Sequence, residues 1–209
     1  CSYPEGSWCS RTDFEAIEPD VERLVELWSM HGSSEGYDTA DRPLRKMDKE
    51  NTVLEALRRG LRVGFVAGSD THSGRPGGSL KEPYPYWGGL AAVWADNLTR
   101  RDLFSALYAR HTYALTGARI VLRMTVNGHL MGSELPPSDT AEIKIDVWAP
   151  GNIESVQLLK NGCCIEEIPG TGQEIHAVRV NSTGGAAFYH CRVAQKDGNI
   201  AVGSPVWIG

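Results

Sequence analysis

The sequence lacks a long apolar run, since no stretch approaches the roughly 18 apolar residues that a membrane-spanning helix needs. It also lacks a block of Lys and Arg, and its 26 acidic against 21 basic side chains give a formal net charge of -5. A basic stripe is the usual footprint of a nucleic-acid-binding protein. We therefore expect no membrane span and no nucleic-acid partner.

Paired cysteine spacings are missing as well. The chain has five Cys, an odd number, and Cys163 and Cys164 are adjacent. This arrangement predicts neither a disulfide framework nor a structural zinc cluster of the Cys-x-x-Cys type. Cys163 and Cys164 are interpreted as strand residues, and the compartment stays open, with bacterial cytoplasm and periplasm both allowed.

An initiator Met and a signal peptide are also absent from the beginning, which reads Cys-Ser-Tyr-Pro. A signal peptide would show a charged segment followed by an apolar stretch. We therefore expect the chain to be the C-terminal part of a longer protein. Its 209 residues suffice for one large domain or two modest ones.

The first half of the chain alternates between strand and helix patterns. Apolar runs at 24–28, 63–67 and 90–94 predict buried strands, and apolar spacing at 51–59 and 99–110 predicts two short helices. Thr99 precedes the second helix as an expected N-cap, with Asp102 three residues later. This alternation of strand and helix patterns is typical of α/β proteins.

From about Tyr113 onward, helical spacing gives way to period-two alternation. Asn127-Gly128, Asn161-Gly162 and Asp197-Gly198 supply hairpin turns between alternating runs. About seven short strands of this kind are typical of an immunoglobulin-like β-sandwich. We therefore predict two domains, an α/β domain over residues 1–114 and an all-β domain over residues 115–209.

Asp70 and His72 form the strongest chemical signal. They are separated by one residue, follow the apolar strand 63–67, and lie between Gly68 and Gly74. A carboxylate and an imidazole suit Zn, Mn or Fe, and such an ion lowers the pKa of bound water to about 7. The alternative, left open by spacing alone, is a turn in which Asp70 caps the backbone and His72 is an ordinary loop residue.

Three further residues belong to the other polar loop and the strand before it. His31 and Glu35 share the loop that follows residues 24–28, so one loop offers an imidazole and a carboxylate. His31 gains weight as a ligand only if it pairs with Asp70 and His72. Glu26 interrupts an apolar strand, where an ionised carboxylate needs a cation, a metal or hydrogen-bond donors, and a paired structural role is preferred.

Residues 68–74, Gly-Ser-Asp-Thr-His-Ser-Gly, resemble the last metal motif of the polymerase and histidinol phosphatase (PHP) superfamily of metal-dependent phosphoesterases. The whole chain resembles the C-terminal third of bacterial PHP-like proteins of uncharacterised function, the DUF3604-type family. The stretches that carry this resemblance are 24–35, 64–77, 88–94, 112–120 and 189–207.

The resemblance implies the C-terminal portion of a distorted (β/α)7 barrel followed by the β-sandwich. It implies a centre of two or three divalent ions, Zn, Mn or Fe, with Asp70 and His72 as catalytic metal ligands and His31 beside them. The early His-x-His motif and the intermediate ligands of such proteins are missing from this sequence. We therefore expect the fragment alone to be inactive, and a homo-oligomer is one way to cover exposed barrel edges.

The leading hypothesis is a metal-dependent hydrolase that acts on a small-molecule phosphoester through metal-activated water. Arg75 follows the ligand motif and is a candidate for binding the anionic group of the substrate, because Arg makes bidentate contacts with phosphate. The alternative hypothesis is a non-catalytic binding or assembly module that recognises a partner through the β-sandwich. Tyr84, Tyr86 and Trp87 would supply contact surface in that case.

Overall fold

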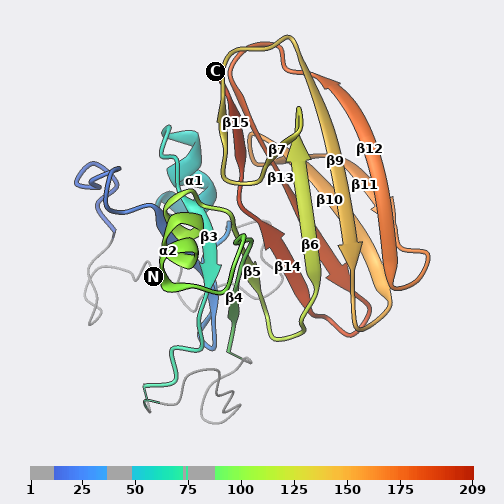
Figure 1. Ribbon diagram of the computed structural model, residues 1–209, viewed down its shortest axis with the longest axis horizontal. Coiled ribbons are helices and arrows are strands. Elements are labelled where there is room, and N and C mark those ends of the chain that lie inside the picture. The colour runs from blue at the N-terminus through green and yellow to red at the C-terminus, as the bar shows by residue number, and fades with distance from the viewer. Residues whose placement is uncertain (1–11, 37–48, 73, 75–87) are drawn as a thin grey trace.

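The computed structural model describes residues 12–36, 49–72, 74 and 88–209 (Figure 1). Over these residues the strands form three sheets, which we call the site sheet, the central sheet and the outer sheet. The site sheet has the order β2-β1-β3 and contains β1 (Leu24–Ser29), β2 (Gly32–Ser33) and β3 (Gly64–Ala67). The outer sheet has the order β12-β9-β6-β7 and contains β6 (Val121–Val126), β7 (His129–Leu130), β9 (Thr140–Trp148) and β12 (Glu174–Ser182).

The central sheet has the main order β11-β10-β13-β14-β5-β4, with β15 pairing both β13 and β8. Its strands are β4 (Leu90–Val93), β5 (Thr112–Leu115), β8 (Glu134–Leu135), β10 (Ile153–Lys160), β11 (Cys163–Pro169), β13 (Ala187–Gln195), β14 (Ile200–Gly203) and β15 (Val206–Ile208). Figure 1 shows the helices and β3 toward one end of the molecule and the outer sheet toward the other.

The middle strands β13 and β14 of the central sheet are buried on both faces. Along β13, Tyr189 and Cys191 belong to the apolar core shared with the outer sheet, whereas Phe188 belongs to the core shared with the site sheet. Neighbouring residues of a strand point to opposite faces, so this alternation places the central sheet between two cores. β14 repeats the pattern, with Ala201 in the first core and Val202 in the second.

Two short helices complete the regular structure of the described residues, together with one 3-10 turn (Lys49–Asn51). Helix α1 (Val53–Arg58) begins after Thr52, whose hydroxyl accepts a hydrogen bond from the Glu55 N–H at 3.2 Å. Helix α2 (Arg100–Tyr108) begins after Thr99, whose hydroxyl accepts from the Asp102 N–H at 3.1 Å. The N-cap predicted at Thr99 is therefore confirmed.

The predicted hairpin turns are confirmed. Asn127 and Gly128 have φ of 49° and 80° and connect β6 to β7, and Asn161 and Gly162 have φ of 52° and 75° and connect β10 to β11. Asn and Gly tolerate this left-handed backbone, which matches the twist of paired strands. Gly198, with φ of 83°, lies in the connection between β13 and β14.

The fold-class prediction, the C-terminal portion of a (β/α)7 barrel followed by an immunoglobulin-like sandwich, is wrong. The described residues form mainly β-sheets in several layers with two helices, and no barrel is present among them. The physical reason lies in strand pairing, because β5 pairs β4 on one side and β14 on the other. Strands from both halves of the chain therefore share one sheet, which the local pattern of residues could not reveal.

Three other expectations concern the oligomer, the domain boundary and residues outside the described ranges. Because no barrel is present among the described residues, a homo-oligomer is no longer needed to cover barrel edges. The predicted boundary between residues 114 and 115 lies inside β5, and the division into two domains stays a prediction. Arg75, Tyr84, Tyr86 and Trp87 lie outside the described residues.

Neither described helix has the length and apolar character required to cross a membrane.

Candidate metal centre

The candidate site lies where two parallel strands end side by side. β1 and β3 pair in parallel, with Trp28 opposite Ala67, and the Gly68 N–H donates to the Trp28 carbonyl at 3.0 Å. Because parallel strands end at the same edge of a sheet, the segments that follow them are neighbours. His31 follows β1 in the turn to β2, and Asp70 and His72 follow β3.

The three predicted ligands converge at this edge. Asp70 Oδ2 lies 3.3 Å from His31 Nε2, and Asp70 Oδ1 lies 2.7 Å from His72 Nε2. The two imidazole rings have centroids 5.6 Å apart. One carboxylate therefore lies between two imidazoles, each facing a different oxygen.

The backbone that carries this cluster adopts an unusual conformation. Asp70 and His72 have φ of 50° and 53°, and Gly74 has φ of 68°. Residues other than Gly rarely adopt a left-handed backbone, and Asp and His are among those that adopt it most readily. Between them, Thr71 is buried, so a buried residue anchors the loop that carries the two ligands.

Exposure differs among the three side chains. Those of His31 and Asp70 are 21% and 29% exposed, whereas that of His72 is 64% exposed. The cluster is thus covered on the side of His31 and open to solvent on the side of His72.

Glu26 is a further carboxylate close to this cluster. A Cβ on Gly68 would lie 2.7 Å from Glu26 Oε1, so the glycine leaves the space that the carboxylate occupies. Burial raises the pKa of Glu26, the negative charge of Asp70 raises it further, and His31 lowers it. Glu26 therefore shares the electrostatic environment of the candidate ligands, although it is not one of the group of three.

Glu35 does not join the cluster. Its side chain is buried and faces Arg192 of β13, with Glu35 Oε2 3.5 Å from Arg192 Nε. The hypothesis that one loop presents both an imidazole and a carboxylate to the same site is therefore wrong for the carboxylate. Cys163 and Cys164 lie at the start of β11 as expected and are exposed free thiols.

The donor set fits a divalent transition ion. One oxygen or nitrogen from each of His31, Asp70 and His72 lies within 4.8 Å of the others, and ligands bind such ions at about 2.0–2.2 Å. Among the described residues, no other group of three or more His, Cys, Asp or Glu side chains meets the same test. Two imidazoles with one carboxylate favour Zn, Mn or Fe over Ca or Mg, which prefer oxygen ligands.

Comparison with known families gives a match over residues 80–150. The matching family is described as "Protein of unknown function (DUF3604)". The chain is similar to the DUF3604 family. This supports the DUF3604-type family expected from the sequence but not the PHP superfamily, and the matched range lies after all three candidate ligands.

Relatives with uncharacterised function match nearly the whole chain. A protein of Chlamydia pneumoniae is 32% identical over 94% of this chain. Proteins of Chlamydia muridarum and Chlamydia trachomatis are each 31% identical over 94% of this chain. The chain spans only 36% of the length of each of these relatives. No solved structure is significantly similar to the chain.

Proposed function

We propose that this chain provides a divalent-metal site, formed by His31, Asp70 and His72, to a metal-dependent hydrolase. The observation that carries the proposal is the convergence of three ligand side chains from two separate loops within 4.8 Å. A turn residue with no function would not need a second imidazole from another loop on the same carboxylate. The left-handed backbone at Asp70 and His72 turns the loop so that both side chains lie at the same end of the site sheet.

Each ligand has a distinct task in this proposal. Asp70 would supply a carboxylate oxygen from between the two imidazoles, since its two oxygens face His31 and His72 separately. His31, on the covered side, limits access by solvent, and the exposed His72 borders the open side. A bound Zn, Mn or Fe ion would act as a Lewis acid and lower the pKa of bound water toward neutrality.

Hydrolysis of a phosphoester is the finer part of the proposal. It is supported by the resemblance of residues 68–74 to the last metal motif of the PHP superfamily, whose members are metal-dependent phosphoesterases. The same ligands also serve amide and other ester hydrolysis. Three ligands suffice for one ion, and a centre of two or three ions would need ligands from elsewhere in a longer polypeptide.

Metal affinity tests the site. We expect the chain to bind Zn²⁺ with 1:1 stoichiometry in a chelator-competition titration. Asp70→Asn, His31→Gln and His72→Gln should each weaken binding by more than about 100-fold, because losing a ligand exceeds the 10–100-fold cost of losing its supporting residues. Asn is chosen at position 70 because it tolerates the left-handed backbone.

His176→Gln is the matched control. His176 Nδ1 also lies 2.8 Å from an aspartate oxygen, that of Asp146, but on the outer sheet. We expect this variant to bind Zn²⁺ as the wild-type chain does. If Asp70→Asn binds Zn²⁺ equally well, the proposed site is wrong.

Hydrolysis is tested on the longest natural polypeptide that contains this sequence. We expect it to cleave bis-p-nitrophenyl phosphate or p-nitrophenyl phosphate in the presence of Mn²⁺ or Zn²⁺, and Asp70→Asn to abolish the cleavage. Cleavage that persists in Asp70→Asn would contradict a catalytic role for this site.

A further inference from the structure

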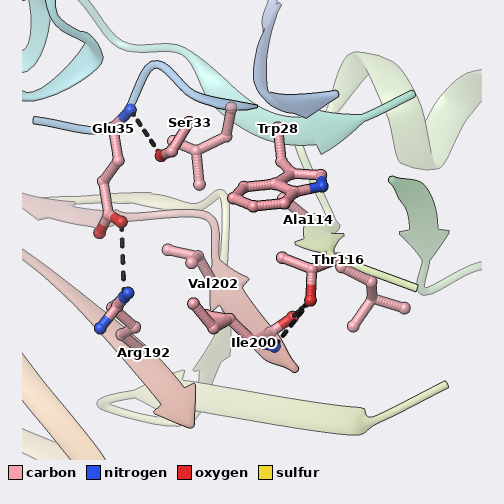
Figure 2. A pocket seen from close by; sticks show the side chains of 10 residues that line it. Trp28, Ser33, Glu35, Ala114, Thr116, Arg192, Ile200 and Val202 are labelled. Carbon is pink, nitrogen blue, oxygen red and sulfur yellow. Dashed lines mark hydrogen bonds and ion pairs between the residues drawn. The ribbon is translucent and has the colours of Figure 1, made fainter. Parts of the chain in front are cut away.

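A buried ion pair joins the His31 loop to the central sheet. Glu35 is 2% exposed and Arg192 is 8% exposed, and Glu35 Oε2 lies 3.5 Å from Arg192 Nε. Figure 2 shows the two side chains reaching toward each other across the space between the site sheet and the central sheet. Two charges removed from water need each other more than a surface pair does.

Arg192 is held rigidly by the central sheet. It lies in the middle of β13, paired with Gln157 of β10 on one side and with Val202 of β14 on the other. A strand paired on both edges and buried on both faces cannot shift locally without breaking either ladder. Arg192 is therefore a fixed point against which a neighbouring segment can be positioned.

Glu35 lies at the end of residues 32–35, the segment that follows His31 and includes β2. The Ser34 N–H donates to the Leu27 carbonyl at 2.9 Å, and the Ser34 hydroxyl donates to the Glu26 carbonyl at 2.6 Å. The Leu54 N–H, in α1, donates to the Glu35 carbonyl at 2.9 Å. Residues 32–35 thus connect the turn that carries His31 to a defined anchor four residues later.

The cavity beside the ion pair is small. Trp28, Ile200 and Val202 line the adjoining cavity, as Figure 2 shows. Its free volume is about 10 Å³, which is room for about one water molecule. Loss of Arg192 would therefore weaken the hold on the carboxylate, because one water cannot replace the buried guanidinium.

We propose that Glu35 and Arg192 are positioning residues for the candidate metal centre: by fixing residues 32–35 to the central sheet, the pair holds His31 against Asp70. The inference rests on the proposed metal site. Supporting residues outside the ligand set commonly change metal affinity by about 10–100-fold. The geometry of the metal site at the end of the site sheet then depends on the positive charge of Arg192 in the central sheet.

Arg192→Met tests the inference by Zn²⁺ affinity. We expect this variant to bind Zn²⁺ about 10-fold or more weakly, in line with losses of supporting residues. Arg192→Lys should retain part of the affinity because it keeps the positive charge. The double variant Glu35→Gln with Arg192→Met should recover most of it, because both charges of the buried pair are then removed together.

Two control variants separate positioning from general damage. Arg123→Met removes an exposed arginine from the outer sheet and should leave Zn²⁺ affinity unchanged. Leu158→Ala lowers stability through the core between the central and outer sheets and should also leave it unchanged. Equal Zn²⁺ affinity in Arg192→Met and wild type, or an equal loss in Leu158→Ala, would overturn the inference.

Hydrogen exchange without metal provides a readout independent of the proposed function. We expect Arg192→Met to speed exchange of the Ser34 amide, which donates to Leu27, while amides of β10 keep their wild-type rates. Unchanged Ser34 exchange would overturn the positioning role. A wild-type chain that binds no Zn²⁺ but shows faster Ser34 exchange in Arg192→Met would refute the proposed function and leave the structural coupling supported.

Discussion

The core between the central and outer sheets and the loops at the end of the site sheet follow opposite rules. In the core, every other residue of β6 and β9 is apolar and buried, as in Leu122, Met124 and Ile145. At the loop ends, polar residues adopt a left-handed backbone and remain partly exposed. The comparison teaches that pattern and burial specify the layers, whereas the candidate site depends on polar side chains that two separate loops bring together.

The largest predicted effect sharpens this comparison by damaging only the core. Leu158 of β10 is fully buried between the central and outer sheets. Leu158→Ala should lower the free energy of unfolding by about 3 kcal/mol, within the range of roughly 2–5 kcal/mol for such cavities. Urea unfolding measures it, and Glu154→Ala, an exposed change on the same strand, should stay within about 0.5 kcal/mol of wild type. A loss below about 1 kcal/mol for Leu158→Ala would contradict the tight packing described for this core.

A second prediction concerns the core on the other face of the central sheet. His190 is fully buried between Phe65 and Phe188, and burial lowers the pKa of His190 to about 3. In the unfolded chain the imidazole gains a proton near pH 6.5, whereas in the folded chain it stays neutral until about pH 3. The free energy of unfolding should therefore fall as pH decreases from 6.5 toward 3, with a slope of up to about 1.4 kcal/mol per pH unit from this group.

His190→Met should remove that contribution and flatten the acid limb of the stability curve, as measured by urea unfolding between pH 7 and pH 4. His129→Gln changes an exposed histidine of β7 and should keep the wild-type slope. An acid limb equally steep in His190→Met would show that His190 is not buried as a neutral group.

Sequence patterns predicted the elements well and their assembly poorly. Period-two alternation, the Asn-Gly turns and the Thr99 cap each depend on neighbouring residues, so they can be read locally. The pairing of β5 with β14 joins residues more than 80 positions apart, and alternation does not say which core a residue faces. The barrel, expected from resemblance alone, was wrong because the described strands pair into several sheets with no barrel among them.

The site was partly predictable on similar grounds. Asp70 and His72 follow one strand, and their spacing with flanking glycines was enough to select them. His31 gained its place only through the parallel pairing of β1 with β3. Arg192 gave no signal, because a lone arginine in an apolar strand does not identify a carboxylate 157 positions earlier.

The smallest predicted effect lies on the site-sheet side of the molecule. The Thr52 hydroxyl caps α1, which packs Leu54 and Leu57 into the core of the site sheet. Thr52→Ala should cost about 1 kcal/mol of stability, the usual value for an N-cap, while Thr52→Ser should cost less because it keeps the hydroxyl. Thermal unfolding of both variants measures the difference, and equal losses would contradict the capping role.

The most direct test of the central claim follows the histidine ring nitrogens by NMR while Zn²⁺ is added to the chain. Convergence of His31, Asp70 and His72 on one ion predicts that the ring signals of His31 and His72 change together and saturate at one equivalent, with those of His176 unchanged. Ring signals of His31 and His72 that stay in place, or that respond at different Zn²⁺ concentrations, would contradict it.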